Sequence, residues 1–289
     1  MVAITGLGFL FMFLAIVPLL MSALNRDART SLQAAAIASF ALGALGGSQL
    51  FVMFVVAFAL PCWYFGQEAR RCMIARDNSV IYKPIGLLML DMTYYACIAM
   101  AMIVLYVGMT GPGITALLNE QARAAASKLP PDYASAIEMV TGALGFLFFS
   151  MLGWMWVIGL YGHAWIANRI LARQNRLQRA SLALEIFTIP SSLLFFVSMA
   201  ALASFIGSES MQFLAKACLI MLLLPYFLSG LALLHHHSTG WPGRGFLLFL
   251  IYIFLISQPW ALLLMAMAGL IYQLLQMNKA LSLPPDSPK

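Results

Sequence analysis

Charged side chains are scarce in this sequence. Of its 289 residues, 16 are Lys or Arg and 10 are Asp or Glu, which is 9% charged, whereas soluble domains carry roughly 25%. Hydrophobic residues make up 63% of the chain. This number of charged residues is too small to cover a water-soluble surface. The apolar side chains must therefore face lipid. We therefore expect an all-α, polytopic integral membrane helical bundle that contacts the lipid bilayer and binds no nucleic acid.

The sequence also lacks the short motifs that carry much of hydrolytic and energy-coupling chemistry. It contains no Walker A sequence, no HExxH, no Gly-x-Ser-x-Gly and no paired aspartates within an apolar run. Its four cysteines show no CxxC spacing, and three lie in apolar runs, so we interpret them as packing residues. We predict that the protein is not an enzyme and has no catalytic residue, cofactor or metal ion.

Long apolar runs are what the sequence does contain. A helix crosses a bilayer with about 20 apolar residues. The runs predict about eight transmembrane helices: Ala3–Leu24, two within Thr30–Gln67, Pro84–Gly108, Met139–Asn168, Ile186–Ile206, Phe213–Leu234 and Phe246–Leu275. Gly46-Gly47-Ser48-Gln49 predicts a tight helical hairpin inside the second run. Gln258-Pro259 leaves two alternatives for the last run, a kinked helix or a re-entrant pair.

These runs predict a single transmembrane domain over residues 1–275, with an extracytoplasmic loop at 109–138 and a short polar C-terminal tail at 276–289. Within the loop, Ile114–Ser127 predicts a short interfacial helix. Over alternate loops, eleven Lys and Arg fall on one side and five on the other, which together make the sixteen in the chain. This bias places the N-terminus outside. Residues 1–24 contain no Lys or Arg, so we expect no cleavable signal peptide.

Asp91 is an acidic residue well inside a predicted span. It lies eight residues after Lys83, about 12 Å deep at about 1.5 Å per residue. Tyr94 and Tyr95 follow at i+3 and i+4, on the same helical face. With Trp154 as an aromatic wall, these side chains predict a small-molecule site, because an ionisable group within a membrane is a functional hypothesis by default. The alternative for Asp91 is a structural hydrogen bond between helices.

Four arginines recur at helical spacing after the fifth predicted span, and we expect them to form one basic stripe: Arg169, Arg173, Arg176 and Arg179. Such a stripe suits anionic lipid headgroups or a membrane or cytoplasmic protein partner. Three consecutive histidines, 235–237, end the seventh run. Neighbouring residues on a helix diverge by about 100°, so we interpret these histidines as interfacial side chains and not as metal ligands.

Gly43 and Gly47 form a GxxxG pair in the second run, with Ala34 and Ala38 continuing the small-residue pattern upstream. Small residues let two helices approach closely. The sequence leaves open whether the second helix belongs to this chain or to a partner.

Three segments carry a family resemblance: Leu60-Pro61-Cys62-Trp63, Tyr82-Lys83-Pro84-Ile85-Gly86, and Tyr226-Phe227-Leu228-Ser229-Gly230-Leu231-Ala232. With the order of spans, they resemble the YybS-like family of predicted bacterial membrane proteins, domain of unknown function 2232. Members often close with Gly-Leu-x-Asp and a nearby Arg, whereas this chain has Gly269-Leu270-Ile271-Tyr272. The resemblance implies a compact helical bundle with a small-molecule cavity, through a distant similarity to substrate-capturing subunits of energy-coupling-factor transporters. It implies no catalytic residue.

We therefore predict a non-enzymatic, multi-pass protein of the bacterial inner membrane that acts as a small-molecule capture or transport component. The alternative is a membrane scaffold or assembly factor that binds protein partners through its basic cytoplasmic loops. The two hypotheses depend on different residues. Changes at Asp91 should weaken ligand binding in the first, and charge reversal at Arg173 and Arg176 should abolish partner binding in the second.

Overall fold

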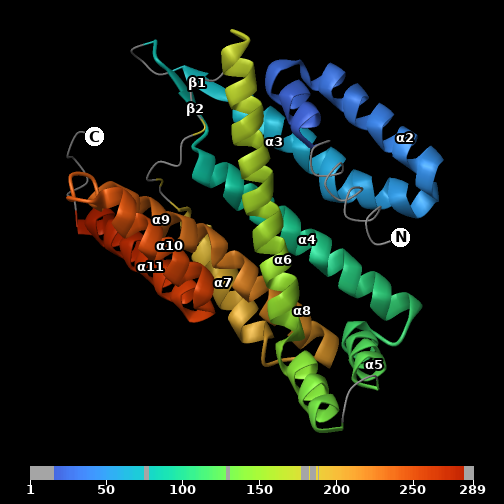
Figure 1. Cartoon of the computed structure of the whole chain (residues 1–289). Coiled ribbons are helices and arrows are strands. Elements are labelled where there is room, and N and C mark those ends of the chain that lie inside the picture. The colour runs from blue at the N-terminus through green and yellow to red at the C-terminus, as the bar shows by residue number, and fades with distance from the viewer. Residues whose placement is uncertain are drawn as a thin grey trace. The chain divides into compact units, whose positions relative to one another are not determined.

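The computed structural model describes residues 16–74, 78–127, 131–176, 182, 187 and 189–282. A helix of residues Ile16–Asn25 comes first. The elements after it are α2 (Ala28–Phe54), the π-helix η1 (Val55–Ala59), α3 (Leu60–Arg70), β1 (Cys72–Ile74), β2 (Val80–Tyr82), α4 (Ile85–Thr110), α5 (Ile114–Ala126), α6 (Pro131–Arg173), α7 (Ser191–Ala203), α8 (Glu209–Leu222), α9 (Leu224–His237), α10 (Arg244–Ser257) and α11 (Pro259–Ser282). Figure 1 shows their course.

Five helical stretches of the described chain are long and apolar enough to cross a membrane: Ala28–Arg70, Ile85–Thr110, Leu144–Arg173, Glu209–His237 and Trp260–Asn278. Three shorter apolar helices accompany them: Ile16–Asn25, Ser191–Ala203 and Arg244–Ser257. The prediction of a helical membrane protein is confirmed at this level. The count of eight spans and the outside N-terminus stay predictions.

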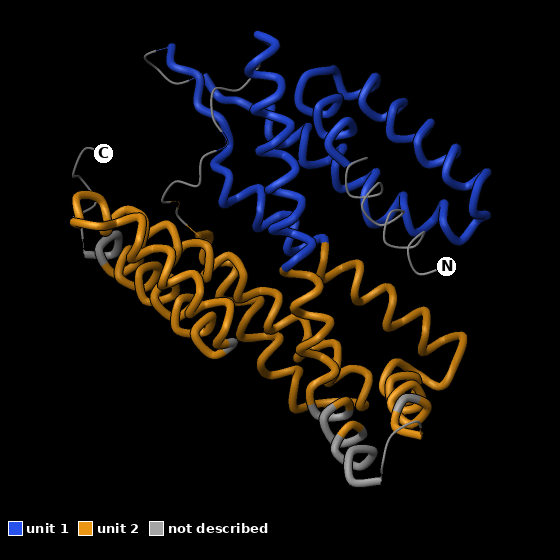
Figure 2. The backbone as a smooth tube through the Cα atoms, viewed as in Figure 1, with its two compact units in different colours: residues 1–95, 155–184 blue, residues 96–154, 185–289 orange. Residues whose placement is uncertain are grey.

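The chain divides into two compact units (Figure 2). Unit 1 contains residues 1–95 and 155–184, and unit 2 contains residues 96–154 and 185–289. Helices α4 and α6 contribute to both. We describe each unit by itself, and the single domain over 1–275 stays a prediction.

Unit 1 contains the helical hairpin predicted within Thr30–Gln67. Gly47 reverses the chain with φ 79° and ψ −178°, a conformation essentially restricted to glycine. The arms then face each other, because the rings of Phe40 and Phe51 lie 5.2 Å apart and the indole of Trp63 donates to Ala28 O at 3.0 Å. A Cβ at Gly43 would lie 2.9 Å from Phe51 Cβ, so this glycine of the GxxxG pair packs inside the hairpin.

In unit 2, α9 and α11 cross at two glycines. A Cβ on Gly230 would lie 2.1 Å from Met265 O, and one on Gly269 would lie 2.0 Å from Tyr226 O. No side chain fits between the two backbones, so each glycine is required by the close approach. Gly230 belongs to a segment that carries the family resemblance, and Gly269 begins the stretch that departs from the family's closing Gly-Leu-x-Asp.

Several boundaries differ from those predicted. Helix α6 begins at Pro131 and not at Met139, since proline is well tolerated at the first helical position, where no N–H is needed. The last apolar run is two helices, because Gln258 is extended (φ −123°, ψ 96°) and α11 turns back from the end of α10 (Figure 1). Helix α11 also continues to Ser282, past the predicted end at Leu275. Ile186, the predicted start of the sixth span, lies outside the described residues.

Candidate functional site

A two-stranded β-hairpin, which the all-helical prediction missed, places Lys83 in unit 1. Strand β1 pairs antiparallel with β2 in the register Cys72–Tyr82, Met73–Ile81 and Ile74–Val80. The N–H of Lys83 then approaches the carbonyl oxygen of Arg71, at 3.5 Å. The signal was available, since Cys72-Met73-Ile74 and Val80-Ile81-Tyr82 are two short apolar runs flanking a polar turn.

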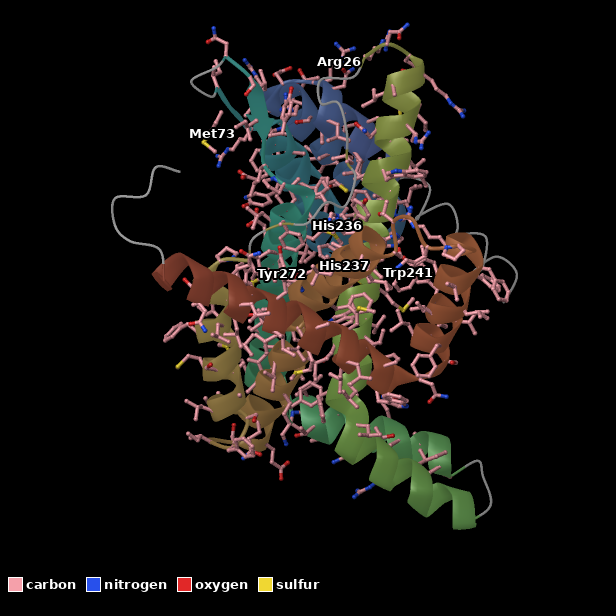
Figure 3. All side chains as sticks on the ribbon, turned by 90° about the vertical axis from the view of Figure 1, so that its left-hand side faces the viewer. Arg26, Met73, His236, His237, Trp241 and Tyr272 are labelled. Carbon is pink, nitrogen blue, oxygen red and sulfur yellow. The ribbon has the colours of Figure 1, made fainter. Side chains whose placement is uncertain are left out.

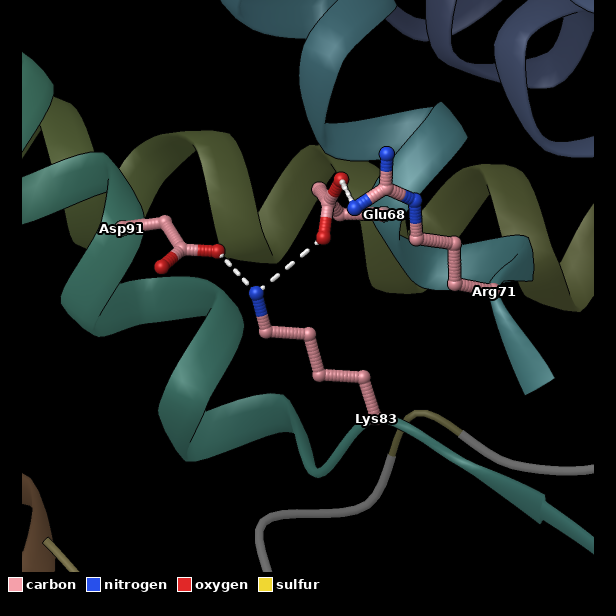
Figure 4. Close-up of polar contacts among 4 residues, drawn as sticks. All are labelled: Glu68, Arg71, Lys83 and Asp91. Atoms are coloured by element: carbon pink, nitrogen blue, oxygen red, sulfur yellow. Dashed lines mark hydrogen bonds and ion pairs between the residues drawn. The ribbon is translucent and has the colours of Figure 1, made fainter. Parts of the chain in front are cut away.

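Lys83 bridges two carboxylates on different helices (Figure 4). Its ammonium lies 3.1 Å from Glu68 Oε2 on α3 and forms a second ion pair with Asp91 Oδ2 on α4. Arg71 NH1 binds the other oxygen of Glu68, at 2.8 Å. Two acids and two bases thus form one network in which the formal charges cancel. The side chain of Glu68 is 6% exposed, so the network stabilises a carboxylate that would otherwise be buried without a counter-ion.

The network also changes the acidity of Lys83, which precedes the α4 span. Burial alone would lower the pKa of its ammonium, but hydrogen bonds to Asp91 and Glu68 and their negative charges more than offset this. The pKa of Lys83 therefore lies above its usual value. In the structure Asp91 is therefore paired with Lys83 of the same chain.

Tyr95 serves a different purpose from Asp91. In η1 the N–H of Leu60 bonds Val55 O, and Pro61 has no N–H, so Val56 O and Ala57 O lack their usual helical donors. The hydroxyl of Tyr95 donates to Val56 O at 2.5 Å, and the indole of Trp156 donates to Ala57 O at 2.8 Å.

The rings of Tyr95 and Trp156 stack at 5.8 Å with an interplanar angle of 19°. This pair thus supplies hydrogen-bond donors to two backbone carbonyl oxygens, which is required where water is excluded. Tyr94 is half-buried on α4.

Trp154 belongs to unit 2. It is 5% exposed, its indole donates to Ile220 O at 3.0 Å near the break before Pro225, and its ring lies 5.2 Å from that of Phe227. Asp91, Tyr95 and Trp154 thus each have separate contacts within the chain. Their assignment to one ligand site stays a prediction.

The arginine stripe ends earlier than the spacing predicts. The guanidinium of Arg169 lies 4.9 Å from the centre of the Trp165 ring, and Arg173 is the last residue of α6. Asn175 then adopts φ 54°, and the N–H of Arg176 bonds Leu171 O at 3.0 Å. This closure is a Schellman motif, so Arg176 lies past the helix and does not continue its face. Arg179 lies outside the described residues.

The histidines lie where α9 ends. His235 Nε2 is 2.7 Å from the hydroxyl of Tyr252, and the guanidinium of Arg244 donates to His235 O at 3.1 Å. Arg244 thereby satisfies an end carbonyl of the helix. Figure 3 labels His236 and His237 at this turn, and their rings are 5.4 Å apart. Within the described residues, no group of three or more His, Cys, Asp or Glu is placed to hold a metal ion.

A polar cavity of about 300 Å³ lies in unit 2 between α5, α6 and α8. Six of its nine lining side chains are polar: Thr115, Asn119, Thr141, Glu209, Gln212 and Lys216. Leu118, Phe146 and Phe213 complete the lining. Lys216 is half-buried, and its ammonium has no hydrogen-bond or ion-pair partner among the described residues.

This cavity was not predicted from the sequence, although the pattern for it exists. Glu209, Gln212, Phe213 and Lys216 follow i, i+3, i+4 and i+7 spacing, which places them on one face of α8. Predicting a cavity also required knowing that α5 packs against that face. A Cβ at Gly113, just before α5, would lie 3.1 Å from Ser210 Oγ, so the close approach depends on that glycine.

A family model described as "Predicted membrane protein (DUF2232)" matches residues 1–271. No curated protein and no solved structure matches the chain. The family named from the resemblance is confirmed. Its YybS-like label and the relation to energy-coupling-factor subunits stay predictions.

Proposed function

Since the chain belongs to the DUF2232 family of predicted membrane proteins, we propose that it is a multi-pass protein of the bacterial inner membrane that captures a small polar molecule. The observation that carries this proposal is Lys216, a half-buried ammonium without a described partner in a cavity of about 300 Å³. A cavity of this size suits a small ligand, and convergent polar groups in a concave site are typical of ligand pockets.

The cavity favours a ligand with an anionic group, such as a carboxylate or a phosphate. The ammonium of Lys216 supplies the positive charge, and the uncharged side chains of Asn119, Gln212 and Thr115 supply hydrogen bonds. Glu209 also lines the cavity but is exposed, so it opposes an anion less than a buried carboxylate would. A charge-assisted hydrogen bond to Lys216 contributes about 1.5 to 3 kcal/mol, or about 10- to 150-fold in affinity.

The predicted topology is consistent with uptake from outside the cell. With the N-terminus outside, α5 and the start of α8 lie on the extracytoplasmic side, where a capture protein meets its ligand. The sequence contains no Walker A motif, so transport through this protein would need proton coupling or a separate energising subunit.

The test is native mass spectrometry of the full chain released gently from its host's membranes. We expect a reproducible small-molecule adduct on the wild type and on Lys216→Arg, which keeps the charge. Lys216→Met should lose the adduct, because the ammonium is the group that holds the anion.

If Lys216→Met carried the adduct at the same occupancy as the wild type, this cavity would not be the ligand site. If Asp91→Asn instead lost that adduct, the site would be the one predicted from the sequence. The scaffold function would be supported by a different result: no adduct, but a protein that copurifies with the wild type. That protein should be lost from a variant in which Arg173 and Arg176 are both replaced by Glu.

A further inference from the structure

A second cavity, of about 230 Å³, lies in unit 2 beside the crossing of α9 and α11. Phe187, Ile189 and Met277 provide apolar walls, and Ser229 and Gln273 provide buried polar groups. Tyr272 also lines it and is labelled on α11 in Figure 3. None of the described residues around this cavity is charged. It therefore differs in chemistry from the Lys216 cavity.

The amide of Gln273 is held in one orientation. Its Nε2 donates to Ile189 O at 3.1 Å and to Pro190 O at 3.3 Å, the carbonyls that precede α7. A flipped amide would place its oxygen against two carbonyl oxygens, so the orientation follows from the hydrogen bonds. The amide oxygen must then point away from both carbonyls.

That oxygen is buried, since Gln273 is only 4% exposed. It nevertheless has no hydrogen-bond partner within the described part of the chain. Ser229, 2% exposed, lines the same cavity, and no hydrogen bond of its hydroxyl is found among the described residues. A buried acceptor left without a donor is unfavourable by about 1 to 3 kcal/mol. The cavity therefore combines a few polar groups with walls that are mostly apolar.

Water alone fits this cavity poorly. A volume of about 230 Å³ corresponds to about seven or eight waters at about 30 Å³ each, and each buried water needs two to four polar partners. The apolar walls at Phe187, Ile189 and Met277 offer none. A charged ligand would also be unfavourable, because none of the described lining residues carries a counter-ion.

We propose that this cavity binds an uncharged amphiphile whose hydroxyl or amide N–H donates to Gln273 Oε1. Its hydrocarbon portion packs against Phe187, Ile189 and Met277, and Ser229 supplies a second hydrogen bond. The glycine crossing keeps α9 and α11 at a fixed separation beside the cavity, so the site is preformed. This inference rests on different residues from the Lys216 proposal.

The experiment uses the full chain in lipid nanodiscs and a photoreactive octanol with a diazirine on carbon 3. The matched control probe is its methyl ether, which has the same tail but no hydrogen-bond donor. We expect the alcohol to label α9 and α11 about fivefold more than the ether, the effect of about one hydrogen bond. Excess 1-octanol should remove the labelling.

Gln273→Met should reduce labelling by the alcohol to the level of the ether. Lys216→Met, which changes the other cavity, should leave it unchanged. Gln273→Met also removes the hydrogen bonds to the carbonyls before α7, so it could reduce labelling by disturbing the fold. Met277→Trp avoids this, because it fills the cavity and keeps the amide of Gln273. It should abolish labelling in protein that still unfolds cooperatively. Equal labelling by alcohol and ether, or wild-type labelling of Met277→Trp, would overturn the proposal.

Discussion

The candidate polar side chains of the two compact units differ in whether they have a partner within the described chain. In unit 1, Lys83 pairs with Glu68 and Asp91, and the carbonyls left free around Pro61 receive the hydroxyl of Tyr95 and the indole of Trp156. In unit 2, by contrast, the ammonium of Lys216 and the amide oxygen of Gln273 have no partner among the described residues, and both side chains line cavities.

This difference separates structural from ligand-binding polar groups. A buried polar group with its partners in place stabilises one arrangement of helices, whereas one without a partner is unfavourable until a ligand supplies the missing group. Asp91 was the strongest candidate from the sequence because it is charged and deep. The structure gives Asp91 an internal partner, and among the described residues it gives none to Lys216.

The largest stability effect is expected where unit 2 is tightest. Gly269→Ala places a methyl group about 2.0 Å from a backbone oxygen of α9, so the helices must separate, and we expect a loss of about 3 kcal/mol. Gly162→Ala is the matched control, because a Cβ there meets nothing within 4 Å, and it should stabilise the protein by up to about 1 kcal/mol.

Thermal unfolding read with a thiol-reactive dye measures both variants, since Cys62 is buried and becomes reactive on unfolding. Exposed Cys72 is first replaced by Ser to remove its background. Equal unfolding temperatures of the two alanine variants would show that the crossing is not tightly packed.

An intermediate effect is expected from one substitution made in each unit. Lys83→Met leaves two carboxylates without their shared cation, and we expect a loss of about 2 kcal/mol, less than for a fully buried pair because Lys83 and Asp91 are 26% and 22% exposed. Lys216→Met removes no described partner and should change stability by less than about 0.5 kcal/mol. The same dye assay measures both. Equal losses would break the contrast between the units.

The smallest effect is the dependence of stability on pH. The pKa of Lys83 in the folded protein lies above the unfolded value of 10.5, so its ion pairs contribute in full below about pH 10.5 and are lost as the pH rises through the raised folded pKa. The difference in unfolding temperature between the wild type and Lys83→Met should therefore shrink as the pH rises above about 10.5. A difference that grows over this interval would contradict the assignment of the pairs.

Much of the helical fold was predictable because composition and hydrophobic run length report directly on the surrounding lipid. The hairpin turn at Gly47 and the break at Gln258-Pro259 were also visible, since glycine and proline act through the local backbone. Lys216 was not, because its significance depends on α5 packing against α8, a contact between residues far apart in sequence. The β-hairpin that brings Lys83 to Glu68 was overlooked because its strands are only three residues each.

The π-helix at Val55–Ala59 has a consequence for insertions and deletions. Removing one residue there would restore an α-helix and turn α3 by about 100° relative to α2. Gln67, which donates to Ser31 Oγ at 3.1 Å, would lose that bond, and Glu68 would turn away from Lys83. The length of this segment is therefore fixed to within one residue, although none of its five side chains carries a polar group. In the exposed loop Thr239–Gly243, a change of one residue would leave these two contacts in place.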